Sequence, residues 1–277
     1  MNMPSQTITL NNNVEFPILG LGTWQAIKSA CVEAVAFALN HGYSLIDTAQ
    51  GYNNETEVGK GWQESGRQRE DIFITTKINN SNQGYDSSKR SFENSLAHLQ
   101  TDYVDLLLIH WPDITNFNKT VETWQAMVEM QKEGLCRAIG VSNFTISLLE
   151  TLKSESDVIP AVNQVEFHPF LYQKSLLTYC RENKIQIEAY SPITRGKFFS
   201  NSVLQRMAEK YAKTPAQIML AWGVNHEIVV IPKSTHQGRI QENADIFFNI
   251  DDEDMAELDS LNRDLRLVKG FWEPPAG

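Results

Sequence analysis

The sequence contains little cysteine. Its 277 residues include three Cys, which are widely separated at Cys31, Cys136 and Cys180. An odd number of cysteines without a CxxC pair argues against both a disulfide framework and a structural zinc site. This pattern is typical of a reducing compartment, and we therefore expect a cytoplasmic protein.

Long apolar runs are also missing. The longest ones, such as Val104–Ile109, are much shorter than the roughly 20 residues with which a helix crosses a bilayer. The first residues, MNMPSQTITL, lack the basic region and the apolar stretch of a secretory signal. We therefore expect neither secretion nor a membrane partner.

Positive charge is scarce. The chain has 24 Lys and Arg against 34 Asp and Glu, which gives a formal net charge of −10. Because such a protein repels a polyanion, we expect no nucleic-acid partner. An anionic ligand would require a local group of Lys and Arg side chains.

Linkers rich in Pro, Gly or Ser are absent too, and strand-like segments alternate with helical ones instead. Two short strands, Thr7–Leu10 and Glu15–Ile18, flank three asparagines and predict an N-terminal β-hairpin. Eight strands follow, each with a helix after it. The expected pairs are Leu19–Trp24 with Ile27–Asn40, Ser44–Ala49 with Glu55–Glu64, Asp71–Ile78 with Ser87–Leu99, Val104–His110 with Thr120–Lys132, Arg137–Ser142 with Ile146–Ser154, Ala161–Phe167 with Lys174–Asn183, Gln186–Tyr190 with Val203–Val224, and Ile228–Ile231 with Gln237–Phe247.

This alternation indicates parallel βαβ units. Eight of them in about 250 residues favour a closed (β/α)8 TIM barrel over a doubly wound sheet. The segment Asp251–Leu261 predicts an additional C-terminal helix, and Arg263–Gly277 predicts a terminal loop. The expected fold class is therefore α/β, with residues 1–277 forming a single barrel domain.

Three consecutive predicted strands end in residues that can move or orient a proton. The strand Ser44–Ala49 contains Asp47, and Tyr52 follows it across a turn. The next two strands end in Lys77 and His110. Catalytic side chains of a parallel barrel come from the carboxyl ends of several strands. We therefore predict an active site formed by these four residues.

Eight short stretches resemble the aldo-keto reductases, and the likeness extends from about Phe16 to Asn262. They are GLGTW (20–24), DTAQGYNNE (47–55), TTK (75–77), LIHWP (108–112), GVSNF (140–144), NQVEFHP (163–169), AYSP (189–192) and IPKSTHQGRIQEN (231–243). The sequence looks most like the small prokaryotic members similar to 2,5-diketo-gluconate reductases. The resemblance implies a barrel that binds NADPH without a Rossmann domain, and the chain has no GxGxxG motif.

The resemblance also implies the NADPH-dependent reduction of aldehydes and ketones to alcohols. Hydride would come from the nicotinamide, and Tyr52 would supply the proton as general acid. A phenol with a pKa near 10 is a weak acid at pH 7 until a neighbouring cation favours its phenolate. Lys77 can be that cation, and Asp47 can hold it charged and in place. His110 can orient the carbonyl oxygen towards Tyr52.

A basic segment late in the chain is the best candidate for an anion site. Lys233 ends the last predicted strand, and Arg239 lies at the start of the next helix, where backbone N–H groups point outward. Arginine suits multidentate contacts with phosphate. The resemblance implies that this segment holds the adenosine 2′-phosphate of the cofactor.

Further cofactor contacts follow from the same resemblance. Ser142, Asn143 and Gln164 match positions that bind the nicotinamide carboxamide, and Tyr190 matches the ring that stacks on the nicotinamide. The complete set of implied cofactor-binding residues is Gly22, Thr23, Asp47, Ser142, Asn143, Gln164, Tyr190, Ser191, Ile193, Lys233, Ser234, Thr235, Arg239, Glu242 and Asn243.

The substrate pocket departs from many relatives at one place. Those relatives carry an apolar residue and a Trp after TTK, whereas here Ile78 is followed by Asn79 and Asn80. We therefore expect a polar wall and a small polar carbonyl substrate, such as diketo-gluconate or methylglyoxal. The implied substrate-binding residues are Trp24, Tyr52, Asn79, His110, Trp111, Phe271 and Trp272. The loop Ser191–Ser202 is short, so the belt that covers the pyrophosphate in larger relatives must be reduced.

Two other classes of protein remain as alternatives. Asp47, His110, Glu166 and His168 could be ligands of a metal-dependent barrel hydrolase. The sequence has no HxH or HExxH pair, however, and Lys77 beside a divalent cation would be unfavourable, so we expect no metal. A non-catalytic, NADPH-sensing barrel subunit would have lost part of the four-residue cluster, which is complete here. We expect a monomer.

Overall fold

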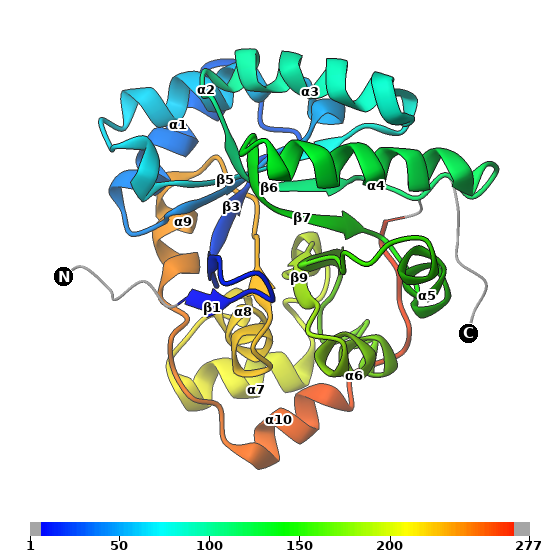
Figure 1. Ribbon diagram of the computed structural model, residues 1–277. Coiled ribbons are helices and arrows are strands. Elements are labelled where there is room, and N and C mark those ends of the chain that lie inside the picture. Colours follow the sequence, from blue (N-terminus) through cyan, green and yellow to red (C-terminus); the bar gives the residue numbers. More distant parts are fainter. Residues whose placement is uncertain (1–6, 269–277) are drawn as a thin grey trace.

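The computed structural model describes residues 7–268, in which eight parallel strands form the wall of a barrel with helices around it (Figure 1). The strands are β3 (Gly20–Gly22), β4 (Leu45–Asp47), β5 (Phe73–Ile78), β6 (Val104–Ile109), β7 (Cys136–Ser142), β8 (Val162–Glu166), β9 (Gln186–Tyr190) and β10 (Val229–Val230). Each strand pairs with the next one along the chain. Bridges from Leu19 to Val230 and from Gly22 to Lys233 join the first strand to the last. The predicted (β/α)8 barrel is therefore confirmed.

The helices cover the outside of this wall (Figure 1). They are α1 (Lys28–Asn40), α2 (Glu55–Glu64), α3 (Tyr85–Leu99), α4 (Phe117–Lys132), α5 (Ile146–Ser154), α6 (Lys174–Glu182), α7 (Ser202–Tyr211), α8 (Pro215–Asn225), α9 (Gln237–Ala244) and α10 (Asp252–Asp259). No helix within residues 7–268 is long and apolar enough to cross a membrane.

The predicted helix Val203–Val224 is wrong in one respect, because the structure divides it into α7 and α8. Ala212 between them has a left-handed backbone with φ of 51°, which ends α7. Thr214 then caps α8 in a capping box with Gln217, and Pro215 occupies the first turn. The sequence carried this signal as a Thr-Pro pair inside an otherwise continuous helical pattern.

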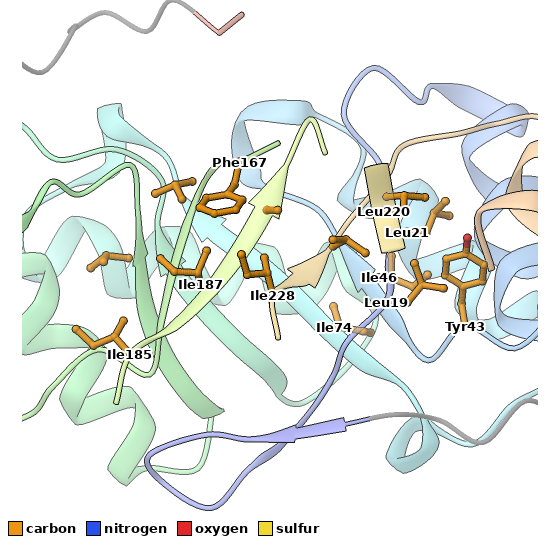
Figure 2. Close-up of a cluster of buried hydrophobic side chains, with 14 of the residues drawn as sticks. Leu19, Leu21, Tyr43, Ile46, Ile74, Phe167, Ile185, Ile187, Leu220 and Ile228 are labelled. Carbon is orange, nitrogen blue, oxygen red and sulfur yellow. The ribbon is translucent and has the colours of Figure 1, made fainter. Parts of the chain in front are cut away.

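Side chains alternate along each strand between the barrel interior and the layer under the helices, as the pleat requires. In the interior, Leu45, Phe73 and Leu106 belong to one buried apolar cluster. Their neighbours Ile46 and Ile74 belong to a second, larger cluster between the strands and the helices, part of which Figure 2 shows.

The N-terminal hairpin closes one end of the barrel. Strands β1 (Thr7–Thr9) and β2 (Glu15–Pro17) pair antiparallel, which confirms the predicted hairpin. Phe16 is fully buried, and its ring centroid lies 4.9 Å from that of Phe73. Asn12 Nδ2 donates to the carbonyl of Arg137, near the start of β7, at 2.9 Å. The hairpin thus covers the amino ends of the strands and leaves the carboxyl ends for the site.

Candidate active site

A cavity of about 770 Å³ lies at the carboxyl ends of the strands. Fourteen of the sequence-predicted site residues line it, namely Gly22, Trp24, Asp47, Tyr52, Asn79, His110, Trp111, Ser142, Asn143, Gln164, Tyr190, Ser191, Ile193 and Lys233. The predicted substrate residues Phe271 and Trp272 lie outside the described residues. The cavity therefore brings together most of the predicted residues from both the catalytic and the cofactor groups.

A buried ion pair forms the back of the cavity. Lys77 Nζ lies 2.7 Å from both Asp47 Oδ1 and Asp47 Oδ2, and 2.8 Å from the carbonyl oxygen of Thr48. An ammonium group has three N–H donors, so all of them are used. Burial alone would lower the pKa of Lys77, but the charges of Asp47 and Tyr52 raise it above its usual value. Lys77 is therefore a fixed, permanently charged group.

Tyr52 lies in front of this pair, in the short 3-10 helix η1 (Gln50–Tyr52). Lys77 Nζ is 5.1 Å from the centroid of its ring. Burial raises the pKa of Tyr52, and the charge of Lys77 opposes this increase without cancelling it. The sequence indicated only the effect of the cation, whereas burial and the charge of Asp47 outweigh it here. At neutral pH the phenol consequently retains its proton, as a general acid must before it acts.

His110 follows β6 and packs edge-on against Tyr52, with ring centroids 5.6 Å apart and an angle of 77° between the ring planes. Burial, and then the charge of Lys77, lower the pKa of His110 to about 3. The imidazole is therefore neutral at physiological pH. It can hydrogen-bond to an oxygen atom in the cavity, whereas the Tyr52 hydroxyl is the group that carries a proton to donate.

The opposite wall is a network of amides and hydroxyls on β7, β8 and β9. Asn143 has a left-handed backbone with φ of 65°, which Asn tolerates better than most residues, and its side chain reaches back into the site. Its Nδ2 donates to the His110 carbonyl oxygen at 3.1 Å and to Ser142 Oγ at 3.0 Å. The Tyr190 hydroxyl donates to Asn143 Oδ1 at 2.8 Å. These contacts fix the Tyr190 ring on the cavity wall.

The predicted anion segment begins at the cavity and continues beside it. Lys233 lines the cavity, and Arg239 lies in the first turn of α9; both side chains are exposed. Glu242 Oε1 instead accepts a hydrogen bond from Thr214 Oγ1 at 2.7 Å. Ser234 and Asn243 are buried, and Thr235 is exposed. Two cations near a helix N-terminus form a suitable site for a phosphate.

Thr23 is the one remaining predicted residue, and it contacts the backbone of Asp47. Its backbone N–H and its hydroxyl both donate to the Asp47 carbonyl oxygen, at 3.0 Å and 2.9 Å. Thr23 is buried and does not line the cavity. In this structure its contacts therefore hold the end of β4.

Two charged residues in or next to the site were not predicted from the sequence. Glu188 is buried inside the barrel on β9, and Oε2 of its carboxyl group accepts from Gln164 Nε2 at 2.7 Å. An acidic residue two positions before Tyr190 on the same strand was the available signal, since both must face the interior. Arg195, in the loop after β9, places its guanidinium 4.6 Å from the centroid of the Trp24 ring. Nothing in the sequence pattern indicated that pair.

Two of the side chains that the metal hypothesis required, those of Glu166 and His168, are engaged in other contacts. His168 Nε2 lies 3.0 Å from Glu166 Oε1, which also accepts from the backbone N–H of Leu267 at 2.8 Å. Glu166 Oε2 accepts from the N–H of Val268 at 3.0 Å. Within residues 7–268, no group of three or more His, Cys, Asp and Glu side chains is arranged to hold a metal ion. Glu166 instead anchors the C-terminal segment to the cavity rim, which Val268 lines.

The fold and this cluster are typical of a TIM-barrel enzyme, with titratable side chains at the carboxyl ends of the strands. The profile of the Aldo/keto reductase family matches residues 18–263. The chain belongs to the aldo-keto reductase family, which is a family of oxidoreductases.

Individual relatives cover almost the whole chain. The chain is 48% identical over 263 residues to a glyoxal reductase of Bacillus subtilis (strain 168), covering 94% of each sequence. It is 42% identical over 266 residues to methylglyoxal reductase DkgA of Escherichia coli (strain K12), again covering 94% of each. A solved structure of a Bombyx mori aldo-keto reductase in complex with NADP matches with a TM-score of 0.90 at 33% identity, and the match covers 96% of both chains.

Proposed function

We propose that this protein reduces small polar aldehydes and ketones with NADPH and that Tyr52 is the general acid. The observation that carries the proposal is the position of Tyr52 beside a neutral His110, with the buried Lys77–Asp47 pair behind them. The named relatives support the same classes of substrate and cofactor, since two are reductases of glyoxal or methylglyoxal and one was solved with NADP.

The residues around the cavity fit an extended dinucleotide phosphate. Near the centre, the Tyr190 ring provides an aromatic surface and Gln164 a polar group. At the rim, Lys233 belongs to the same cavity and Arg239 lies just beyond it on α9. These groups would hold the nicotinamide and the adenosine 2′-phosphate respectively. When bound, NADPH supplies the hydride for the carbonyl carbon.

The protein contributes the proton and the orientation of the substrate. His110 donates a hydrogen bond to the carbonyl oxygen and holds it near the Tyr52 hydroxyl. Tyr52 then gives its proton to that oxygen as the hydride reaches the carbon, so the product is a neutral alcohol. The charge of Lys77, 5.1 Å from the ring, stabilises the phenolate that remains. Solvent protons restore the phenol before the next turnover.

The substrate side of the cavity supports a preference for small polar compounds. Asn79 and Asn80 both line it, and the side chain of Asn80 is exposed. Asn79 Oδ1 accepts from the N–H of Asn80 at 2.9 Å, so part of its amide is already used to cap a short 3-10 helix. A side chain at Gly51 would meet both Asn79 and His110, which places Asn79 next to the catalytic residues. Apolar substrates would have to displace water from these amides at a cost.

The proposal is tested by following NADPH absorbance with the purified protein and a panel of carbonyl compounds. The panel includes glyoxal, methylglyoxal, diketo-gluconate and an aromatic aldehyde. We expect turnover of the first three to exceed that of the aromatic aldehyde, and Tyr52→Phe is the matched control for the background rate. The absence of turnover above that control for every compound would refute the proposal.

A further inference from the structure

Glu188 is a fully buried acid that the proposed mechanism does not use. Its side chain extends from β9 into the barrel interior with 0% exposure. Among the described residues, Gln164 is its hydrogen-bond partner at Oε2, and Oε1 has none. The nearby cation Lys77 already uses its three N–H groups on Asp47 and Thr48. A carboxyl group is expensive to bury in this way, so its position requires an explanation.

The contact of Glu188 determines how the Gln164 amide is oriented. Gln164 Nε2 donates one hydrogen to Asp47 Oδ2 at 2.8 Å and the other to Glu188 Oε2 at 2.7 Å. A side-chain amide nitrogen has two hydrogens and no acceptor capacity, so both ends of this nitrogen are fixed. Rotating the amide by half a turn would place its carbonyl oxygen against the Asp47 carboxylate, which has no hydrogen to donate. Gln164 must therefore keep its nitrogen inside the barrel and its Oε1 on the side of the cavity that it lines.

The side-chain oxygen of the neighbouring amide already has a donor within the protein. Asn143 uses Nδ2 on His110 and Ser142, and its Oδ1 accepts from the Tyr190 hydroxyl. Ser142 Oγ donates to the Gln164 backbone carbonyl at 2.8 Å. Gln164 Oε1 is thus the side-chain carbonyl that this wall presents to a ligand.

We propose that Glu188 is a positioning residue, which holds the Gln164 amide with Oε1 towards the cavity so that this oxygen accepts from the NH2 group of the nicotinamide carboxamide. This inference rests on the proposed function, since it assumes that NADPH occupies the cavity. Asp47 alone would engage one hydrogen of Gln164 Nε2 and leave the amide free to swing. With the second acceptor on β9, the amide is bonded on both hydrogens and its plane is fixed.

The charges in the barrel agree with this role. Burial and the charge of Asp47 raise the pKa of Glu188 to about 8, while Gln164 and Lys77 act in the opposite direction. At pH 7 the carboxyl group is therefore mainly neutral, and a neutral carboxyl group still accepts through its carbonyl oxygen. The ion pair of Asp47 and Lys77 then remains the only charged pair next to Gln164 in the described part of the chain. Glu188 provides an acceptor there without adding a second negative charge.

The experiment compares two cofactors that differ in the group that Gln164 would recognise. Isothermal titration calorimetry at pH 7 gives the Kd of NADPH and of its reduced 3-acetylpyridine analogue, in which a methyl group replaces the amide NH2. We expect the native protein to prefer NADPH by about 3- to 10-fold, the scale of one neutral hydrogen bond. Glu188→Met removes the acceptor at similar volume and should abolish the preference. Glu188→Gln keeps an acceptor oxygen and should retain it, and Gln164→Leu gives the reference value without the carbonyl group.

Each outcome has a defined meaning. Loss of the preference in E188M together with its retention in E188Q supports the proposal, because a merely structural residue would weaken both cofactors equally. A preference that survives in a cooperatively folded E188M, or that disappears equally in E188M and E188Q, overturns it. If E188M does not fold, Glu188→Thr is measured in the same way and decides the question. Failure of the native protein to bind NADPH would instead refute the proposed function.

Discussion

Replacing Lys77 with Met should strongly destabilise the protein, because Asp47 would become a buried charge without a cation. Asp47 is 2% exposed and would keep Gln164 as a donor, but it would lose two hydrogen bonds of 2.7 Å and the positive charge. Removing one partner of a buried ion pair costs about 3–5 kcal/mol. Met fills most of the space of the Lys stem, so little of this loss comes from a cavity. We therefore expect the free energy of unfolding to fall by about 3–5 kcal/mol at pH 7.

Urea unfolding followed by circular dichroism measures this change, provided that the m-value stays constant. The matched control is Lys153→Met. Lys153 is 44% exposed and lies 4.0 Å from Glu150, and such surface pairs contribute about 0–1 kcal/mol. A loss in Lys77→Met no larger than that of the control would show that the buried pair does not stabilise the fold.

The pH dependence provides an independent check with a defined sign. Without Lys77, burial raises the pKa of folded Asp47 above its unfolded value of roughly 3.9. The folded state of Lys77→Met then binds more protons than its unfolded state. The loss in the free energy of unfolding is therefore greatest at neutral pH and becomes smaller as the pH falls through the raised pKa. Asp47→Asn added to Lys77→Met removes the charge and should recover part of the loss. If neither low pH nor this second substitution reduces the loss in the free energy of unfolding, the loss is not electrostatic in origin.

Further predictions concern catalysis and binding. Tyr52→Phe should lower kcat by about 10²–10⁴-fold and leave the Kd of NADPH unchanged in a fluorescence titration, because it removes only the proton donor; near-native kcat would exclude Tyr52 as the acid. Arg239→Ala should weaken NADPH by about 1.5–3 kcal/mol and leave NADH unaffected, since it removes a charge-assisted contact with the extra phosphate; equal losses for both cofactors would contradict that role. Asn79→Trp should raise kcat/KM for an aromatic aldehyde relative to a sugar-derived ketone by about 1–3 kcal/mol, and an unchanged ratio would show that Asn79 does not face the substrate. The pKa of His110 is about 3, so His110 should not change its protonation state between about pH 5 and 7 and should cause no change in kcat/KM there. A change in kcat/KM near pH 6.5 that disappears in His110→Asn would show that the imidazole is not neutral.

The barrel and most of the cavity could be predicted from the sequence because the signals are local. The apolar runs of β4, β5 and β6 have a polar residue at or next to their ends, so Asp47, Lys77 and His110 can be assigned to the carboxyl ends from the sequence alone. Parallel strands in a closed ring then bring those ends together. The break between α7 and α8 was missed because the apolar pattern continues across Ala212, although Thr214 and Pro215 carried the signal.

Contacts between distant segments could not be predicted in this way. Glu188 bonds to Gln164 on the neighbouring strand, and its neutral state depends on the burial and the charge of Asp47. Glu166 anchors the N–H groups of Leu267 and Val268, about a hundred residues further along the chain, which no periodicity reveals. The same holds for the raised pKa of Tyr52, since burial is a property of the folded state.

The bridges that join β3 to β10 have a consequence for the order in which this enzyme can form during synthesis. Leu19 pairs with Val230, and Gly22 with Lys233, so the ring cannot close until more than four-fifths of the chain has left the ribosome. Tyr43 adds a hydrogen bond of 2.9 Å to the carbonyl of Ile240, which is made later still. Strands β4 to β6 are contiguous and can pair early, whereas Lys233 takes its place only after β10 has been made. A nascent chain would thus hold the Asp47–Lys77 pair before the barrel closes, and two unpaired strand edges would be open to aggregation until then.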